Sequence, residues 1–162
     1  MARDLEIIQT DRLILRGINE EDTYEIVKWR SDPEVYRFFK NPHQISVKEH
    51  LAWYNNSYLV NEDRFDWMCI EKATGGKVGV FGLAKTSDCV EVNYLLAPEA
   101  QHKGYAAESI EGIIRYARKK WHVKRVVAEI HRDNTPSLAL VQGMGFKMSA
   151  QKDEFVLYAI EG

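Results

Sequence analysis

Short apolar runs alternate with turn-forming residues in the middle of the chain, a pattern that is typical of strands. Three of these runs are predicted to be strands, at 65–71, 77–84 and 89–96. The turns between them fall at 74–76, where two glycines stand together, and at 86–88. Because the connections are so short, we expect the three strands to form an antiparallel meander.

Other stretches show helix-start signals and helical spacing of apolar residues. Asn19 and Asn134 are placed to cap helices, and Ser46-x-x-Glu49 is a capping box. One short extra helical turn is expected at 34–39, just before Asn41-Pro42. The four predicted helices cover about 19–30, 46–54, 105–120 and 134–145.

Further strands are predicted on both sides of these helices, at 12–16, 123–130, from Phe146 onward, and at 155–160. The strand at 123–130 follows the strand at 89–96 through a helix, so the two should be parallel and joined by a right-handed crossover. Together, the predicted helices and strands indicate an α+β fold in a single domain over residues 1–162. It has about four helices and a mixed, twisted sheet of about six or seven strands.

Composition restricts the possible partners. With 22 Lys and Arg against 24 Asp and Glu, the formal net charge is -2, which offers no broad basic surface for nucleic acid. Cys69 and Cys89 lie in apolar runs without metal-ligand spacing, so we expect neither a metal site nor a disulfide. The sequence shows no signal-like segment and no apolar run of about 20 residues. We therefore expect a cytoplasmic protein with small ligands and no nucleic acid or membrane partner.

The most informative motif is the tight turn Gln101-His102-Lys103-Gly104-Tyr105-Ala106, which connects a predicted strand to a predicted helix. Gly104 permits a positive φ or a close approach to a ligand, and the free N–H groups of the helix start point outward together. The helix dipole adds about half a positive charge at this end. The turn can therefore bind a phosphate group without any basic side chain.

Two elements in order, Gln101-x-x-Gly104-x-Ala106 and then Asn134-x-x-Ser137 with Gly145-Phe146, resemble the GCN5-related N-acetyltransferases, or GNATs. The resemblance covers nearly the whole chain. It implies acetyl-CoA as co-substrate and a sheet whose two central parallel strands splay apart, with the pantetheine arm lying in the gap like an added strand. The coenzyme would contact Tyr94, Leu95, Leu96, Gln101, His102, Lys103, Gly104, Tyr105, Ala106, Asn134 and Ser137.

Acetyl transfer to an amine requires an uncharged nitrogen and a donor for the oxyanion of the tetrahedral intermediate. By the same resemblance, the backbone N–H of Leu96 is the oxyanion candidate. Glu91 is the first candidate for the base, directly or through a water molecule. Glu129 is the second candidate, with His131 behind it.

The sequence departs from the common form of the family at the residue that would protonate the leaving thiolate. Many members place a tyrosine in the fourth helix, and this chain has Val141 at that position. Ser137, which matches a serine of the ribosomal-protein and spermidine acetyltransferases, is the candidate that hydrogen-bonds the sulfur. Departure of the thiolate followed by protonation from water is the alternative.

The acceptor would enter over the first helices, which are rich in aromatic residues. The candidate substrate-binding residues are Trp29, Arg30, Tyr36, His50 and Trp53. The region 28–34 resembles acetyltransferases of amino groups on nucleotide-linked sugars, whereas 10–16 resembles the ribosomal-protein branch. We expect the acceptor to be a primary amine on a small molecule. An amino sugar is the first candidate, and a protein N-terminus or a polyamine is the alternative. A non-catalytic acyl-CoA-binding module is the alternative of another class, and a homodimer is possible in either case.

Overall fold

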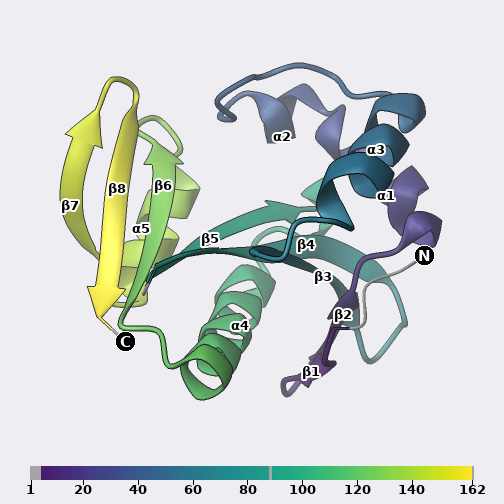
Figure 1. The fold of residues 1–162 in the computed structure, drawn as a ribbon. Helices are drawn as coiled ribbons and strands as arrows, with labels where there is room; N and C mark the ends of the chain where they lie inside the picture. The colour runs from purple at the N-terminus through teal and green to yellow at the C-terminus, as the bar shows by residue number, and fades with distance from the viewer. Residues whose placement is uncertain (1–4, 88, 162) are drawn as a thin grey trace.

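The computed structural model describes residues 5–87 and 89–161, which form one eight-stranded sheet flanked by helices (Figure 1). Residue 88, in the second predicted turn, and residues 1–4 and 162 lie outside the described residues. The strand order across the sheet is β1-β2-β3-β4-β5-β6-β8-β7. The strands are β1 (Ile8–Gln9), β2 (Leu13–Gly17), β3 (Arg64–Glu71), β4 (Lys77–Thr86), β5 (Cys89–Leu96), β6 (Arg125–His131), β7 (Lys147–Lys152) and β8 (Phe155–Glu161).

The predicted meander is confirmed, because β3, β4 and β5 pair antiparallel in sequence order and β2 pairs with β3. The predicted parallel pair is also confirmed, but it is short. The strands β5 and β6 pair only from Cys89 with Arg125 to Glu91 with Val127. Beyond Glu91 the two strands diverge, and β6 continues with β8 and β7 as a separate antiparallel wing (Figure 1).

The first helices lie on one face of the sheet (Figure 1). They are η1 (Glu20–Asp22), α1 (Thr23–Arg30), α2 (Pro33–Tyr36), α3 (Val47–Trp53) and the π-helical turn η2 (Tyr54–Tyr58). The predicted caps form: the Asn19 side chain accepts from the backbone N–H of Glu21, and Ser46 and Glu49 make the reciprocal capping box. Ser46 thus begins α3 after the loop 37–46, which follows α2.

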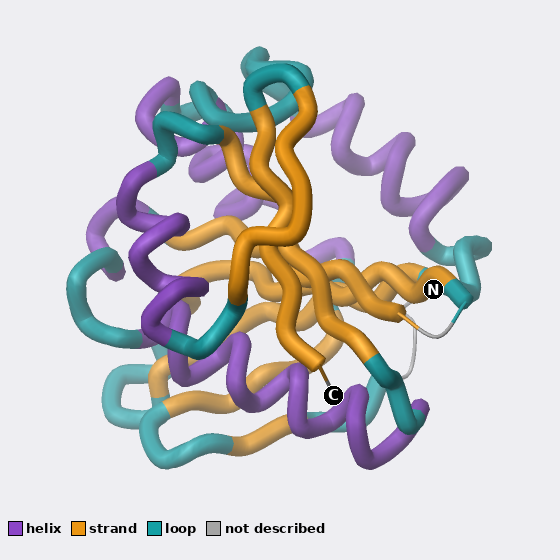
Figure 2. Tube along the Cα trace, turned by 90° about the vertical axis from the view of Figure 1, so that its left-hand side faces the viewer, coloured by secondary structure: helices purple, strands orange, loops and turns teal. Residues whose placement is uncertain are grey.

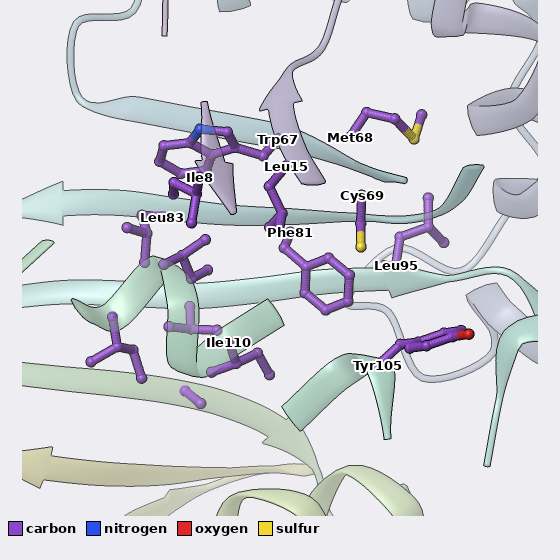
Figure 3. Packing of buried hydrophobic residues seen from close by; sticks show 14 of the residues in the cluster. Ile8, Leu15, Trp67, Met68, Cys69, Phe81, Leu83, Leu95, Tyr105 and Ile110 are labelled. Atoms are coloured by element: carbon purple, nitrogen blue, oxygen red, sulfur yellow. The ribbon is translucent and has the colours of Figure 1, made fainter. Parts of the chain in front are cut away.

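The opposite face is covered by α4 (Tyr105–Trp121), which follows η3 (Pro98–Ala100). Its apolar stripe, including Ile110, Ile113 and Ala117, is buried against the sheet. Phe81 and Leu83 of β4 project toward this helix (Figure 3). The last helix, α5 (Thr135–Gly143), packs beside β6, and the trace in Figure 2 shows helices on both sides of the strands.

Two counts differ from the sequence prediction. The sheet has eight strands among the described residues because Ile8–Gln9 adds a two-residue edge strand, too short for periodicity to reveal. Five α-helices are described where about four were expected, because the extra helical turn predicted at 34–39 is itself an α-helix, α2, with Asp32 as its cap and Pro33 at its first position. No helix within 5–87 and 89–161 has the length and apolar character needed to cross a membrane.

Candidate active site

A cavity of about 750 Å³ opens where β5 and β6 diverge. Its walls come from β5, β6, the start of α4, one side of α5 and the loop after α2. The volume falls in the range of ligand pockets. The interruption of the sheet therefore creates a deep binding space between two strands that would otherwise be hydrogen-bonded to each other.

The turn before α4 forms one end of this cavity. Gly104 is the residue before the helix and has a φ of 79°, and His102 has a φ of 65°, so both take left-handed conformations. Arg12, the residue before β2, holds the turn in place: its Nη1 donates to the Lys103 carbonyl at 2.9 Å and its Nε pairs with Glu108 at 2.7 Å. The described N-terminus of α4 has no side-chain cap, which leaves its first N–H groups for a ligand.

The residues predicted for the coenzyme gather around the cavity, with one exception. The lining includes Tyr94, Leu95, Leu96, Gln101, His102, Gly104, Tyr105, Ala106, Asn134 and Ser137. Lys103 is absent from the lining, and its backbone carbonyl faces Arg12 instead.

The free edge of β5 directs backbone N–H groups into the gap, and one of them belongs to Leu96. Ala97 donates its N–H to the carbonyl of Val78 at 2.8 Å, on the β4 side. Backbone groups alternate sides along a strand, so the N–H of Leu96 points away from β4 and toward the divergent β6. Leu96, the predicted oxyanion donor, therefore presents its N–H to the gap between β5 and β6.

Two hydroxyl groups meet across the cavity. The Tyr94 hydroxyl lies 2.5 Å from Ser137 Oγ, and Ser137 itself is buried in the first turn of α5. Burial raises the pKa of Tyr94, and the hydrogen bond to Ser137 opposes this only in part. The Tyr94 hydroxyl therefore stays protonated at neutral pH. Val141 is buried and also lines the cavity, so an apolar side chain occupies the position of the usual tyrosine.

The candidate bases Glu91 and Glu129, and His131, also line this cavity. Glu91 is the last residue of the β5–β6 pairing, and burial, reinforced by the nearby Glu129, raises its pKa. Glu129 is held by Lys40, whose Nζ is 2.8 Å from Glu129 Oε1. The Phe38 ring packs 5.3 Å from the ring of His131. The loop after α2 thus engages Glu129 and His131, whereas Glu91 has no such partner among the described residues.

A second cavity of about 530 Å³ lies between the sheet and the first helices. The two cavities share Phe39, Glu91, Asn93, Tyr94 and Leu95 in their linings, so they meet at the end of the β5–β6 pairing. Of the predicted substrate residues, Arg30, His50 and Trp53 line the second cavity. Trp29 is 3% exposed in the hydrophobic core, and the half-buried Tyr36 lines neither cavity.

Sequence reasoning missed the polar floor of the second cavity. Across the three neighbouring strands β3, β4 and β5, the register places Asp66 beside Gly82 and Gly82 beside Asn93. Arg64, two residues before Asp66 on β3, pairs with Ala84. A Cβ on Gly82 would lie 2.0 Å from Asp66 Oδ1, so only glycine leaves room for this carboxylate. The sequence does contain a signal for it, an aspartate between Phe65 and Trp67 in the strand Arg64–Glu71. A charged residue among apolar strand residues is costly to bury and therefore indicates a polar site.

A mixed sheet that opens at its parallel pair, with a left-handed glycine turn at the open end, defines the class of protein as an N-acetyltransferase of the GNAT fold. The profile of the acetyltransferase (GNAT) domain matches residues 12–147. The chain belongs to this family, and the family assignment from the sequence motifs is confirmed.

Individual relatives agree with this assignment. The chain is 30% identical over 146 residues to an uncharacterized N-acetyltransferase, YoaA, of Bacillus subtilis, covering 87% of this chain and 82% of the relative. It is 22% identical to the acetyltransferase PseH of Campylobacter jejuni, over 85% of each chain. The spermidine N-acetyltransferase of Vibrio cholerae, solved with CoA and spermine, has a similar fold, with a TM-score of 0.82 and 17% sequence identity. The match covers 94% of this chain and 96% of that one.

Proposed function

We propose that this enzyme transfers an acetyl group directly from acetyl-CoA to a primary amine in a ternary complex, without a covalent enzyme intermediate. The observation that carries the proposal is the end of the β5–β6 pairing at Glu91 and Val127, where the cavity in the opened sheet meets a second cavity under the first helices. One cavity suits the coenzyme and the other suits the acceptor. The amine nitrogen attacks the thioester carbon at their junction, and the carbon–sulfur bond then breaks.

In this proposal the coenzyme is bound mainly by backbone. The N–H groups at the start of α4, next to the left-handed Gly104, hold the pyrophosphate. The pantetheine arm pairs with the free edge of β5 from Tyr94 to Leu96, with Asn134 on the other side. The N–H of Leu96 donates to the oxyanion that forms when the amine attacks.

We propose Glu91 as the base that accepts the proton of the amine, directly or through water. An alkylammonium has a pKa near ~10.4, so at neutral pH its deprotonation costs about 4 to 5 kcal/mol without help. The raised pKa of Glu91 brings this carboxylate closer to the operating pH and makes it a better proton acceptor. Glu129 is the weaker candidate, because Lys40 already neutralises it.

For the leaving thiolate we propose the hydroxyl pair Ser137 and Tyr94. Ser137 donates a hydrogen bond to the departing sulfur, while the Tyr94 hydroxyl donates to Ser137 Oγ. The pair would replace the tyrosine that Val141 displaces. Release of the thiolate and its later protonation by water remains the alternative route.

An amino sugar is our first candidate for the acceptor, and the resemblance to PseH supports it. The fold shared with a spermidine acetyltransferase keeps a polyamine as the second candidate, with a protein N-terminus as the third. The test is release of CoA thiol from acetyl-CoA with a panel of amines, combined with the melting temperature in the presence of CoA. Coenzyme stabilisation with thiol release supports the proposal, whereas stabilisation without release from any amine would reveal a binding module.

A further inference from the structure

The acceptor cavity contains an arginine that lacks a counterion. Arg30 is the last residue of α1 and lines the cavity of about 530 Å³. Its Nε is buried, and none of the atoms of residues 5–87 and 89–161 accepts a hydrogen bond from it. The guanidinium carbon lies 5.3 Å from the centre of the Phe39 ring, and no described carboxylate pairs with the group. A buried donor without a partner, on a half-buried cation, is costly unless a ligand satisfies it.

Among the described residues, no carboxylate around the cavity lies within ion-pair distance of Arg30. Arg64 Nε donates to Asp66 Oδ2 at 3.0 Å, so this arginine has its own carboxylate. Burial lowers the pKa of His50, so its imidazole is neutral at pH 7. The exposed His43 lies on the same lining. With the Arg64 and Asp66 charges paired, Arg30 and Glu91 remain as one cation and one carboxylate in a single cavity.

We infer that the acceptor carries an acidic group, a carboxylate or a phosphate, and that Arg30 binds this group while the amine faces Glu91. The inference rests on the proposed function, because it concerns the acceptor of the same reaction. A guanidinium fork matches the geometry of both acidic groups and forms charge-assisted hydrogen bonds with them. The ligand would satisfy the buried Nε and supply the missing counterion.

The same arrangement disfavours a polycationic acceptor. A polyamine would place additional positive charge beside Arg30 and Arg64, where burial already lowers the pKa of Arg30. Only Glu91 would be available to compensate, because Asp66 is engaged by Arg64. This chain should therefore select against polyamines although it shares a fold with a spermidine acetyltransferase.

Binding of small anions tests the inference independently of turnover. The melting temperature is measured with inorganic phosphate and separately with glutarate, at constant ionic strength and with saturating CoA, so that the turn before α4 is occupied. We expect Arg30→Gln to weaken the apparent affinity for one of these anions at least about tenfold. Arg115→Gln, on the exposed side of α4, is the matched control and should bind as wild type does. Equal binding by wild type and Arg30→Gln, or no binding by wild type, overturns the inference.

Matched amines test the same point in catalysis and separate carboxylate from phosphate. The pairs are 5-aminopentanoate against pentylamine, and phosphoethanolamine against ethanolamine. We expect the acidic member of one pair to be preferred about tenfold or more in kcat/KM. Arg30→Gln should lower kcat/KM for the acidic member much more than for the uncharged amine and so remove the preference, while Arg30→Lys should restore part of it.

The two proposals fail in different ways. Preferred turnover of the uncharged amines, or of spermidine, overturns the acidic acceptor and leaves the acetyltransferase intact. Loss of turnover for both members of a pair in Arg30→Gln also overturns it, because Arg30 would then act on the fold or on the amine. Absence of CoA stabilisation and of thiol release contradicts the proposed function itself.

Discussion

The two cavities that meet at Glu91 are built from different parts of the chain. The coenzyme side depends on backbone geometry, namely the left-handed turn at Gly104 and the free edge of β5 beyond Glu91. The acceptor side depends on side chains from separate elements, such as Arg30 of α1 and Asp66 of β3. Backbone sites need particular residue types at fixed local spacing, whereas side-chain sites can be assembled from any elements that the fold brings together. This difference explains why one half of the site could be predicted from a motif and the other could not.

The largest expected effect is on the backbone side, from Gly104→Glu. A side chain at φ 79° is strained, its Cβ would lie 3.3 Å from Arg12 Nη2, and its carboxylate would repel the pyrophosphate. We expect CoA affinity to fall at least about 100-fold by isothermal titration calorimetry. Gly75→Glu is the control, because Gly75 has a φ of 74° in an exposed turn with free space around it. If the Gly104 variant binds CoA normally, the phosphate lies elsewhere.

The next effect is at the junction of the two cavities, from Glu91→Gln. Loss of the base should lower kcat about 100-fold and leave CoA affinity unchanged. The pKa of Glu91 is raised, and only its unprotonated form accepts a proton, so wild-type activity should fall as the pH drops through that raised value. The variant should lack this acid limb in its profile of kcat/KM against pH. If Glu91→Gln keeps the same fall of activity in acid, Glu91 is not the base. Glu129→Gln is the comparison, because Glu129 is already paired with Lys40.

The start of α1, the helix that carries Arg30 of the acceptor side, can be weakened through Asp22. This fully buried carboxylate pairs with Arg16 at 2.8 Å and with Lys77 at 2.9 Å. Although burial opposes ionisation, these partners and the Asn19 N–H lower its pKa, so it contributes stability above about pH 4 that is lost as the pH falls through the lowered pKa. Asp22→Asn should therefore reduce the free energy of unfolding by about 2 kcal/mol at pH 7, measured by urea titration.

The control for that variant is Glu21→Gln, an exposed neighbour that should leave stability unchanged. The stability difference between wild type and Asp22→Asn should shrink in acid, where both side chains are uncharged. A difference that is constant from pH 7 to pH 3 would show that the charge of Asp22 does not stabilise the start of α1.

The smallest effect is expected from the hydroxyl pair. Ser137→Ala and Tyr94→Phe should each lower kcat about tenfold or less, since water can protonate the thiolate. Because the two groups act through one hydrogen bond, the double variant should lose little more than either single variant. Fully additive losses in single-turnover thiol release would show that the two hydroxyls act independently.

The sequence predicted the elements whose signals are local. The capping box at Ser46, the turn at Gly104 and the crossover between β5 and β6 each depend on neighbouring residues and appear in the structure. The position of Trp29 could not be predicted, because an aromatic residue on a short helix can face the core or a cavity. The row formed by Asp66 and Asn93 depends on strand register across the sheet, which no single segment encodes.

The most direct test of the account is a crystal structure of the enzyme with acetyl-CoA. We predict that the pyrophosphate accepts hydrogen bonds from the N–H groups that follow Gly104, and that the thioester lies between Leu96 and Ser137 in the gap between β5 and β6. A coenzyme bound elsewhere, or strands β5 and β6 hydrogen-bonded to each other beyond Glu91, would contradict it.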